Sequence, residues 1–181
     1  MSTVTADNAI DRPESNRDAA AGTGGDTAQV VSFRLADEEY GLDIMKVQEI
    51  ILVGEITEIP EVPDYLRGLI DLRGKVIPIV DLRRRFGLEA GTCTEQARIV
   101  VVNTGESIFG IVVDAVNEVL RIGSSQIEPP PTGLLGIEQA YIKGLVKMED
   151  KIMILLNIDR VLSKADTSQI QQQSRGASVS N

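Results

Sequence analysis

The side chains that most often carry catalysis are scarce in this chain. Its 181 residues include no histidine, which removes the usual general base near neutral pH and the commonest metal ligand. The single cysteine, Cys93, lies in a polar stretch with no neighbouring base, so we expect no nucleophilic thiol. A hydrolase could work with an Asp/Glu pair alone, but no convergent polar cluster is evident. We therefore expect no enzymatic activity, no cofactor and no metal.

Three charged or glycine-rich stretches have structural explanations. Residues 37–39, Asp-Glu-Glu, lack the spacing of an EF-hand calcium loop and suit a turn. The three arginines at 83–85 could bind an anion, but basic residues in the last turn of a short helix explain them better. Residues 22–25 lack the Lys-Ser/Thr and the preceding strand of a phosphate loop. An interaction scaffold, which needs no catalytic residue, is therefore the leading hypothesis.

The composition of the chain argues against nucleic-acid binding, membrane insertion and secretion. A net charge of -9 and a pI near 4.6 argue against a nucleic-acid-binding protein, because such binding rests largely on neutralising phosphates. No segment approaches the roughly 18 uninterrupted apolar residues of a membrane helix, and the N-terminus lacks the features of a secretory signal. A lone cysteine suits a reducing cytoplasm. We expect a cytoplasmic protein with no direct membrane insertion.

An internal repeat supplies the elements that would carry a binding surface. Residues 65–86 align without a gap with residues 141–162, at an offset of 76. Residues 30–51 align with residues 99–120 at an offset of 69. The larger second offset predicts an insertion in the second copy, around Pro129–Gly133.

Short apolar runs separated by turn signals predict strands within each copy. In the first copy the predicted strands are residues 30–35, 40–44, 56–60, 69–72 and 76–80. Residues 45–50 fit either a helical turn or more strand, and the sequence leaves this open. Pro78 predicts that its strand lies at an edge or contains a bulge. Arg73-Gly74-Lys75 has the length of a hairpin connection.

Two short helical turns are also predicted in the first copy. Pro63 and Gly68 fit the start and stop of a single turn. Asp81 fits an N-cap, with Gly87 as the stop after residues 82–86. Asn157 stands at the place of Asp81 in the second copy.

Each copy therefore predicts about five short strands, which is typical of a small barrel or sandwich. We expect an all-β domain over residues 30–163, with barrel-like halves at about 30–88 and 97–163. Two units of this size bury little surface alone, so they should pack together and leave a groove for docking. Residues 1–29 are expected to form a disordered tail and residues 164–181 a flexible one.

These motifs together resemble the CheW family of chemotaxis coupling proteins. The resemblance covers residues 30–163 and rests on four runs, at residues 37–44, 46–50, 72–82 and 110–116. It implies an all-β fold with a few short helices, in which an internal duplication gives two tandem Src-homology-3-like five-stranded β-barrels. It also implies no catalysis.

The resemblance further implies a set of partners. Family members are adaptors that couple transmembrane chemoreceptors to the histidine kinase CheA in chemotaxis signal transduction. The cytoplasmic tips of the receptors would dock between the barrels, and the regulatory domain of CheA on one barrel. The protein would then be recruited from the cytoplasm to membrane-associated receptor arrays. An alternative is a paralogous adaptor of a related kinase pathway, such as surface motility.

The resemblance also implies roles for particular residues. The receptor-binding positions would be Glu49, Arg73, Val47, Ile44 and Val119. Gly68 would lie near the kinase, although its predicted role as a helix stop is sufficient explanation. Glu49 and Arg73 could equally form a solvated ion pair, and the three apolar residues could belong to the barrel core. Asp71 stands where the family usually has Asn, and its charge could tune the local surface.

Overall fold

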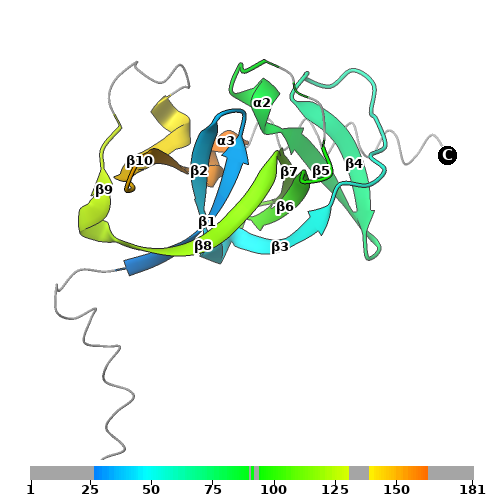
Figure 1. The fold of residues 1–181 in the computed structure, drawn as a ribbon. Helices are drawn as coiled ribbons and strands as arrows, with labels where there is room; N and C mark the ends of the chain where they lie inside the picture. Colours follow the sequence, from blue (N-terminus) through cyan, green and yellow to red (C-terminus); the bar gives the residue numbers. More distant parts are fainter. Residues whose placement is uncertain (1–26, 90, 92–93, 131–138, 163–181) are drawn as a thin grey trace, which may run out of the picture.

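The computed structural model describes residues 27–162, except 90, 92–93 and 131–138. Most of both predicted tails, Cys93 and most of the predicted insertion lie outside these residues. Within them the predicted all-β class is confirmed: strands form two sheets, and the helices are short. Strands β9 and β10 lie at one end of the molecule and β4 at the other, with β1 and β2 between them (Figure 1).

We call the two sheets barrel A and barrel B. Barrel A has the strand order β8 (Ala115–Gly123), β1 (Thr27–Leu35), β2 (Glu38–Asp43), β11 (Ile152–Leu156), β10 (Ile142–Lys147), β9 (Ile127–Glu128). Barrel B has the order β3 (Val47–Leu52), β6 (Arg98–Asn103), β7 (Ile108–Val113), β5 (Lys75–Asp81), β4 (Leu66–Leu72). The helices are α2 (Leu82–Arg85) and α3 (Ile158–Val161), with 3-10 turns η1 (Ile44–Lys46), η2 (Ser124–Gln126) and η3 (Gln139–Tyr141).

The two barrels exchange their first hairpins. β1 and β2 come from the first repeat, yet they pair with β8 and β11 of the second. β6 and β7 come from the second repeat and pair with β3 and β5 of the first. The prediction that the barrels are the contiguous halves 30–88 and 97–163 is therefore wrong, because a repeat in sequence does not fix which copy a strand pairs with.

The register of the strands follows the repeat closely. Val31 faces Val119 in barrel A, and their counterparts Val100 and Ile50 face each other in barrel B. Gly41 faces Leu155, and their counterparts Gly110 and Ile79 also face each other. The two barrels are thus copies of one another at the level of backbone pairing.

Each barrel encloses a small apolar interior, and a larger core lies between them. In barrel A the interior includes Val30, Met153 and Leu155, and in barrel B it includes Ile79 and Val101. The larger cluster draws on strands of both sheets and on both short helices. Its largest members are Phe33, Tyr40, Phe86, Phe109 and Tyr141. Burial of this shared surface joins the barrels into one unit.

The helix α2 fits its sequence signals and settles the role of the three arginines. The Asp81 carboxylate accepts a hydrogen bond from the Arg84 backbone N–H at 3.3 Å, as an N-cap should. The Arg83 side chain pairs with Asp114. The Arg85 guanidinium lies 4.2 Å from the Tyr65 ring centre, and its Nε donates to the Val161 carbonyl at 2.8 Å. Arg83 and Arg85 therefore hold neighbouring parts of the fold together, whereas the Arg84 side chain is half exposed and lies 3.7 Å from Asp81.

Gly68 has a different role from the predicted helix stop. Pro63 and Leu66 form only a turn, and Gly68 lies inside β4, at an irregularity in the pairing with β5. Its φ of 150° is one that side-chain-bearing residues rarely adopt, and a Cβ here would collide with the Thr57 backbone carbonyl. Thr57 and Leu69 form an isolated bridge at this point, so the strand predicted at 56–60 is reduced to a single pairing.

Two further expectations need correction. β1 begins at Thr27, so residues 27–29 pair with β8 and do not belong to a disordered tail. Backbone hydrogen bonds to a neighbouring strand order these residues although their side chains are exposed. The strand of Pro78, β5, lies between β7 and β4 and is not at an edge, and the extra residue at the irregularity is Arg67 of β4, so β5 itself has no bulge. Its pairing with β7 begins only at Ile79, so proline interrupts no ladder there.

Asp114 links the two barrels where the chain passes from β7 to β8. Its carboxylate pairs with the Arg83 guanidinium of α2 at 2.6 Å and accepts the Ala36 backbone N–H at 2.8 Å. Burial alone would raise the pKa of Asp114, but the hydrogen bonds from Arg83 and Ala36 and the nearby arginine charges outweigh it and lower this pKa.

We expect Gly68→Ala to lower the free energy of unfolding by more than about 2 kcal/mol, because alanine would be strained at this φ and would meet the Thr57 carbonyl. Gly54→Ala is the matched control, since a Cβ at Gly54 has open space. Urea denaturation of both variants measures the difference. Equal stability of the two variants would contradict this role of Gly68.

We expect Asp114→Asn to cost about 1–3 kcal/mol at pH 7, because Arg83 loses its charged partner. The contribution of Asp114 is complete above its unfolded pKa of about 3.9, and it is lost as pH falls through the lower pKa of the folded state. Thermal unfolding between pH 7 and pH 2 should therefore show a shallower acid decline in the variant. An unchanged acid decline, matching that of the exposed control Glu58→Gln, would contradict the prediction.

Candidate partner-binding site

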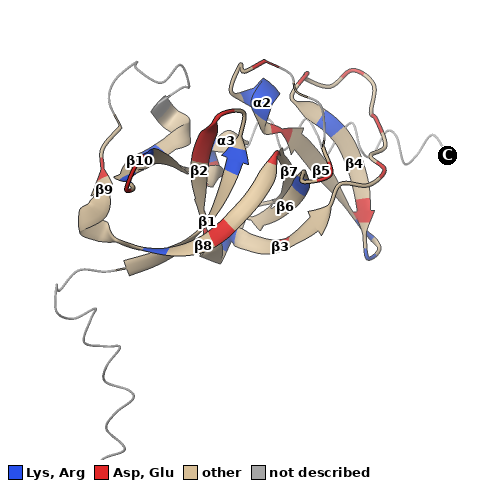
Figure 2. Ribbon diagram, viewed as in Figure 1, with Lys and Arg blue, Asp and Glu red and all other residues tan. Residues whose placement is uncertain are grey.

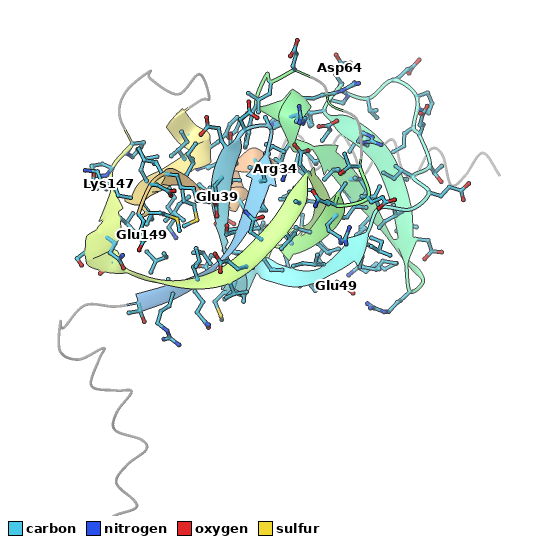
Figure 3. All side chains as sticks on the ribbon, in the orientation of Figure 1. Arg34, Glu39, Glu49, Asp64, Lys147 and Glu149 are labelled. Carbon is cyan, nitrogen blue, oxygen red and sulfur yellow. The ribbon has the colours of Figure 1, made fainter. Side chains whose placement is uncertain are left out.

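Glu49 and Arg73 are brought together as an exposed ion pair at one end of barrel B. The two guanidinium Nη atoms donate to the two carboxylate oxygens at 2.6 and 2.7 Å, a bidentate arrangement. The predicted ion pair is therefore confirmed. The pair connects β3 with the turn that follows β4. β3 and β4 are the first and last strands in the order of this sheet. Figure 3 shows Glu49 beside β3, away from the labelled cluster of Glu39, Lys147 and Glu149.

A bulge in β3 sets the direction of the Glu49 side chain. Val47 pairs with Val102, but Glu49 pairs with Val101, so Gln48 is the extra residue. Val47 accordingly packs on the core between the barrels, whereas Ile51 packs on the interior of barrel B. Glu49 shares the alternation of Ile51 and thus stands at the open end of that interior.

A tight turn sets the position of Arg73. Leu72 pairs with Lys75, so Arg73 and Gly74 form a two-residue turn, one shorter than the predicted connection. Both have positive φ, 54° and 85°, as in a type I′ hairpin. A left-handed conformation costs a residue such as arginine about 1–2 kcal/mol. The Asp71 carboxylate accepts the Gly74 backbone N–H at 2.8 Å and closes the turn.

The pair is electrostatically matched but solvated. The hydrogen bonds from Arg73, together with its charge, lower the pKa of Glu49, and the same bonds raise the pKa of Arg73. Both groups therefore remain charged at neutral pH. The Glu49 side chain is 21% exposed but that of Arg73 is 72% exposed, so water reaches the pair through the guanidinium and its effect on folding stability is small. Its small contribution to folding stability does not by itself explain why the chain carries this pair.

The other predicted receptor-binding residues lie apart in the fold. Ile44 and Val47 stand at the two ends of η1, and both are half-buried. Val47 also lines a hollow of about 460 Å³ together with Met45 and Asn103. Val119 is 50% exposed on β8, in the other barrel, where it faces Val31 of β1.

Exposed apolar residues near Glu49 were missed by the sequence reasoning. Ile50 and Leu52, on the outer face of β3, are 40% and 69% exposed, and Met45 in η1 is 83% exposed. Figure 2 shows that β3 carries little charge along its length. Ile50 is the repeat counterpart of Val119, so the repeat alignment was the signal that could have identified it.

Gly68 contributes backbone and no accessible side chain. It is buried in β4, where it allows Thr57 to come close. Its neighbour Arg67 is partly exposed on the same strand. Any effect of Gly68 on a partner must therefore pass through the shape of β4.

The corresponding end of barrel A has different chemistry. The counterparts of Glu49 and Arg73 are Glu118 and Glu149, two acids that cannot pair with each other. They line a hollow of about 910 Å³, which also contains Glu39.

Glu39 is only 7% exposed and contacts both Ser32 and Lys151. Burial alone would raise the pKa of Glu39, but hydrogen bonds from Lys151, Ser32 and Asn117 and the charge of Lys151 outweigh it and lower this pKa. Ile108 and Val101 replace Glu39 and Ser32 in barrel B, so this buried polar group belongs to one copy alone.

Two other classes of site are absent from the described residues. Within residues 27–162, apart from the gaps given above, no group of three or more His, Cys, Asp or Glu side chains is arranged to hold a metal ion. No helix in the same part of the chain is long and apolar enough to cross a membrane.

Comparison with known proteins gives one family. The model of the CheW-like domain matches residues 29–166. The chemotaxis protein CheW of Klebsiella aerogenes is 38% identical over 134 residues, which is 74% of this chain and 81% of that protein. The CheW of Treponema pallidum is 33% identical over 146 residues, covering 78% of this chain and 86% of that protein.

A solved structure extends the similarity to the fold. The crystal structure of the scaffolding protein TtCheW from Thermoanaerobacter tengcongensis superposes with a TM-score of 0.72 at 38% identity. The match covers 78% of this chain and 91% of that one. Its similarity and the two-sheet topology agree with the predicted pair of Src-homology-3-like barrels. On sequence, on fold and on the match across residues 29–166, this chain is a member of the CheW-like family.

Proposed function

We propose that this protein is a non-catalytic chemotaxis adaptor, which couples transmembrane chemoreceptors to the histidine kinase CheA. The names of its relatives support a role in chemotaxis, and that of TtCheW supports a scaffold. The observation that carries the proposal furthest is that β3 bears both the Glu49–Arg73 ion pair and, on its outer face, exposed apolar side chains. Such a combination suits a protein interface, with an apolar centre and a polar rim that fixes register.

The receptor tip would bind along β3 in this proposal. Ile50 and Leu52 supply apolar area, and the Glu49–Arg73 pair supplies charged hydrogen-bonding groups at the side. Ile44 and Val47, at the two ends of η1 next to β3, would extend the apolar surface, and Val119 would contribute from barrel A. The adaptor would work from the cytoplasm and be recruited to receptor arrays.

The kinase would bind barrel B near β4. Gly68 would act there indirectly, because its backbone conformation brings β4 against Thr57 and so shapes the strand. The contact would involve the regulatory domain of CheA. An adaptor of a paralogous kinase, for instance in surface motility, would use the same surfaces, and the choice of kinase in the assay separates the two.

The primary test is co-sedimentation of the purified protein with receptor-containing membranes and CheA, with kinase autophosphorylation as the readout. We expect the protein to raise both the amount of membrane-bound CheA and its activity. Failure to bind either the receptor membranes or CheA would refute the adaptor function for this chain, while leaving its fold unaffected.

We expect Glu49→Ala and Arg73→Ala each to weaken co-sedimentation with receptor membranes on the order of tenfold, as for a residue that matters to an interface. The melting temperature should change little, because the pair is solvated. Glu128→Ala is a matched control, since it removes another exposed ion pair, with Lys147, in barrel A.

The two readouts together decide what the pair does. A large fall in melting temperature for both variants would make the pair structural. Receptor binding that stays at the level of the control would exclude the pair from the interface.

A further inference from the structure

We propose that Asp71 is a positioning residue, which holds Arg73 in the geometry needed for its pair with Glu49 and hence for receptor binding. This inference rests on the proposed function. Asp71 is exposed on β4 and lies two residues before Arg73. Its carboxylate reaches the Gly74 N–H, on the far side of Arg73 in the chain.

The hydrogen bond between Asp71 and Gly74 spans Arg73, the residue with the unfavourable backbone conformation. Arg73 is held at positive φ between the carboxylate of Asp71 and the backbone of Gly74. An arginine has no intrinsic preference for this conformation, and no short side chain with which to stabilise it locally. Without the bond from Asp71, the turn would lose one restraint against opening, and the Arg73 guanidinium would spend less time in register with Glu49.

The second copy of the repeat provides an internal comparison. Lys147 stands at the position of Asp71, and a lysine side chain cannot accept a hydrogen bond. Its Nζ lies 3.7 Å from Glu128, directed to a neighbouring strand and not to the turn. Glu149 replaces Arg73 in this copy. An acceptor before the turn and an arginine within it thus occur together in the copy that carries the candidate site.

The positioning role of Asp71 requires an acceptor oxygen and not a charge. Substitutions can therefore distinguish this role from a direct contact between Asp71 and the receptor. Asparagine keeps an acceptor oxygen at the same place and removes the charge. Alanine removes both. A residue that touched the receptor through its charge would be impaired by both substitutions.

The test measures receptor co-sedimentation for Asp71→Ala, Asp71→Asn, Arg73→Ala and the double variant Asp71→Ala/Arg73→Ala. We expect Asp71→Ala to bind about five- to tenfold more weakly, about the effect of one hydrogen bond, and Asp71→Asn to bind as the wild type does. The double variant should bind no more weakly than Arg73→Ala, because Asp71 acts through Arg73. Asp150→Ala, an acid in the matching turn of barrel A, is the control for the lost charge.

Additive losses in the double variant, or a loss in Asp71→Asn equal to that in Asp71→Ala, would overturn the proposal.

A second readout does not depend on receptors: the NMR signal of the Arg73 Nε–H in the free protein. It should shift in Asp71→Ala and stay in place in Asp71→Asn. If the wild type fails to bind receptors, the proposed function is wrong, and the NMR signal still decides whether Asp71 positions Arg73. An Arg73 signal unchanged in Asp71→Ala would overturn that role.

Discussion

The apolar core between the two barrels is the feature on which the rest of the structure depends. Phe33 and Tyr40 enter it from barrel A, while Phe109 enters from barrel B. The interiors of the barrels are smaller clusters of aliphatic side chains. The first hairpin of each copy pairs with strands of the other copy. The chain of each copy therefore passes from one sheet to the other, next to this core. The exchange therefore ties the two barrels together, since each sheet contains strands of both copies.

Backbone geometry has been retained in both copies while side-chain chemistry has diverged. The bulge at Gln48 has a counterpart at Asn117, and each places a glutamate at the open end of its barrel. In barrel B that glutamate, Glu49, meets an arginine. In barrel A, Glu149 stands in place of that arginine, and Glu118 lines a hollow together with the buried Glu39 and its exposed partner Lys151. A duplicated scaffold thus offers two equivalent positions with different charges, so the two positions are not interchangeable as binding surfaces.

Much of the local structure could be predicted from the residues alone. The hairpin of β1 and β2, the cap at Asp81 and the two apolar runs around Arg73 follow from alternation and turn chemistry. Gly68 shows where such reasoning fails. Its position after Pro63 fits a helix stop, yet the need for glycine comes from the approach of Thr57, eleven residues away in the chain. Glu49 and Arg73 were recognised as a pair, but the apolar residues around them were not, because alternation does not reveal which face a bulged strand exposes.

The duplication, the all-β class and the family can be recognised from the residues, since these depend on the order and spacing of residue types along the chain. Which copy each strand joins cannot be recognised in this way, because the two copies offer nearly equivalent registers and the choice rests on packing across the shared core. The tertiary structure also decided that Arg83 would bind Asp114 and Arg85 would stack on Tyr65, while Arg73 would face outward with Glu49. Local chemistry fixes what an arginine can do, and long-range packing selects the partner it meets.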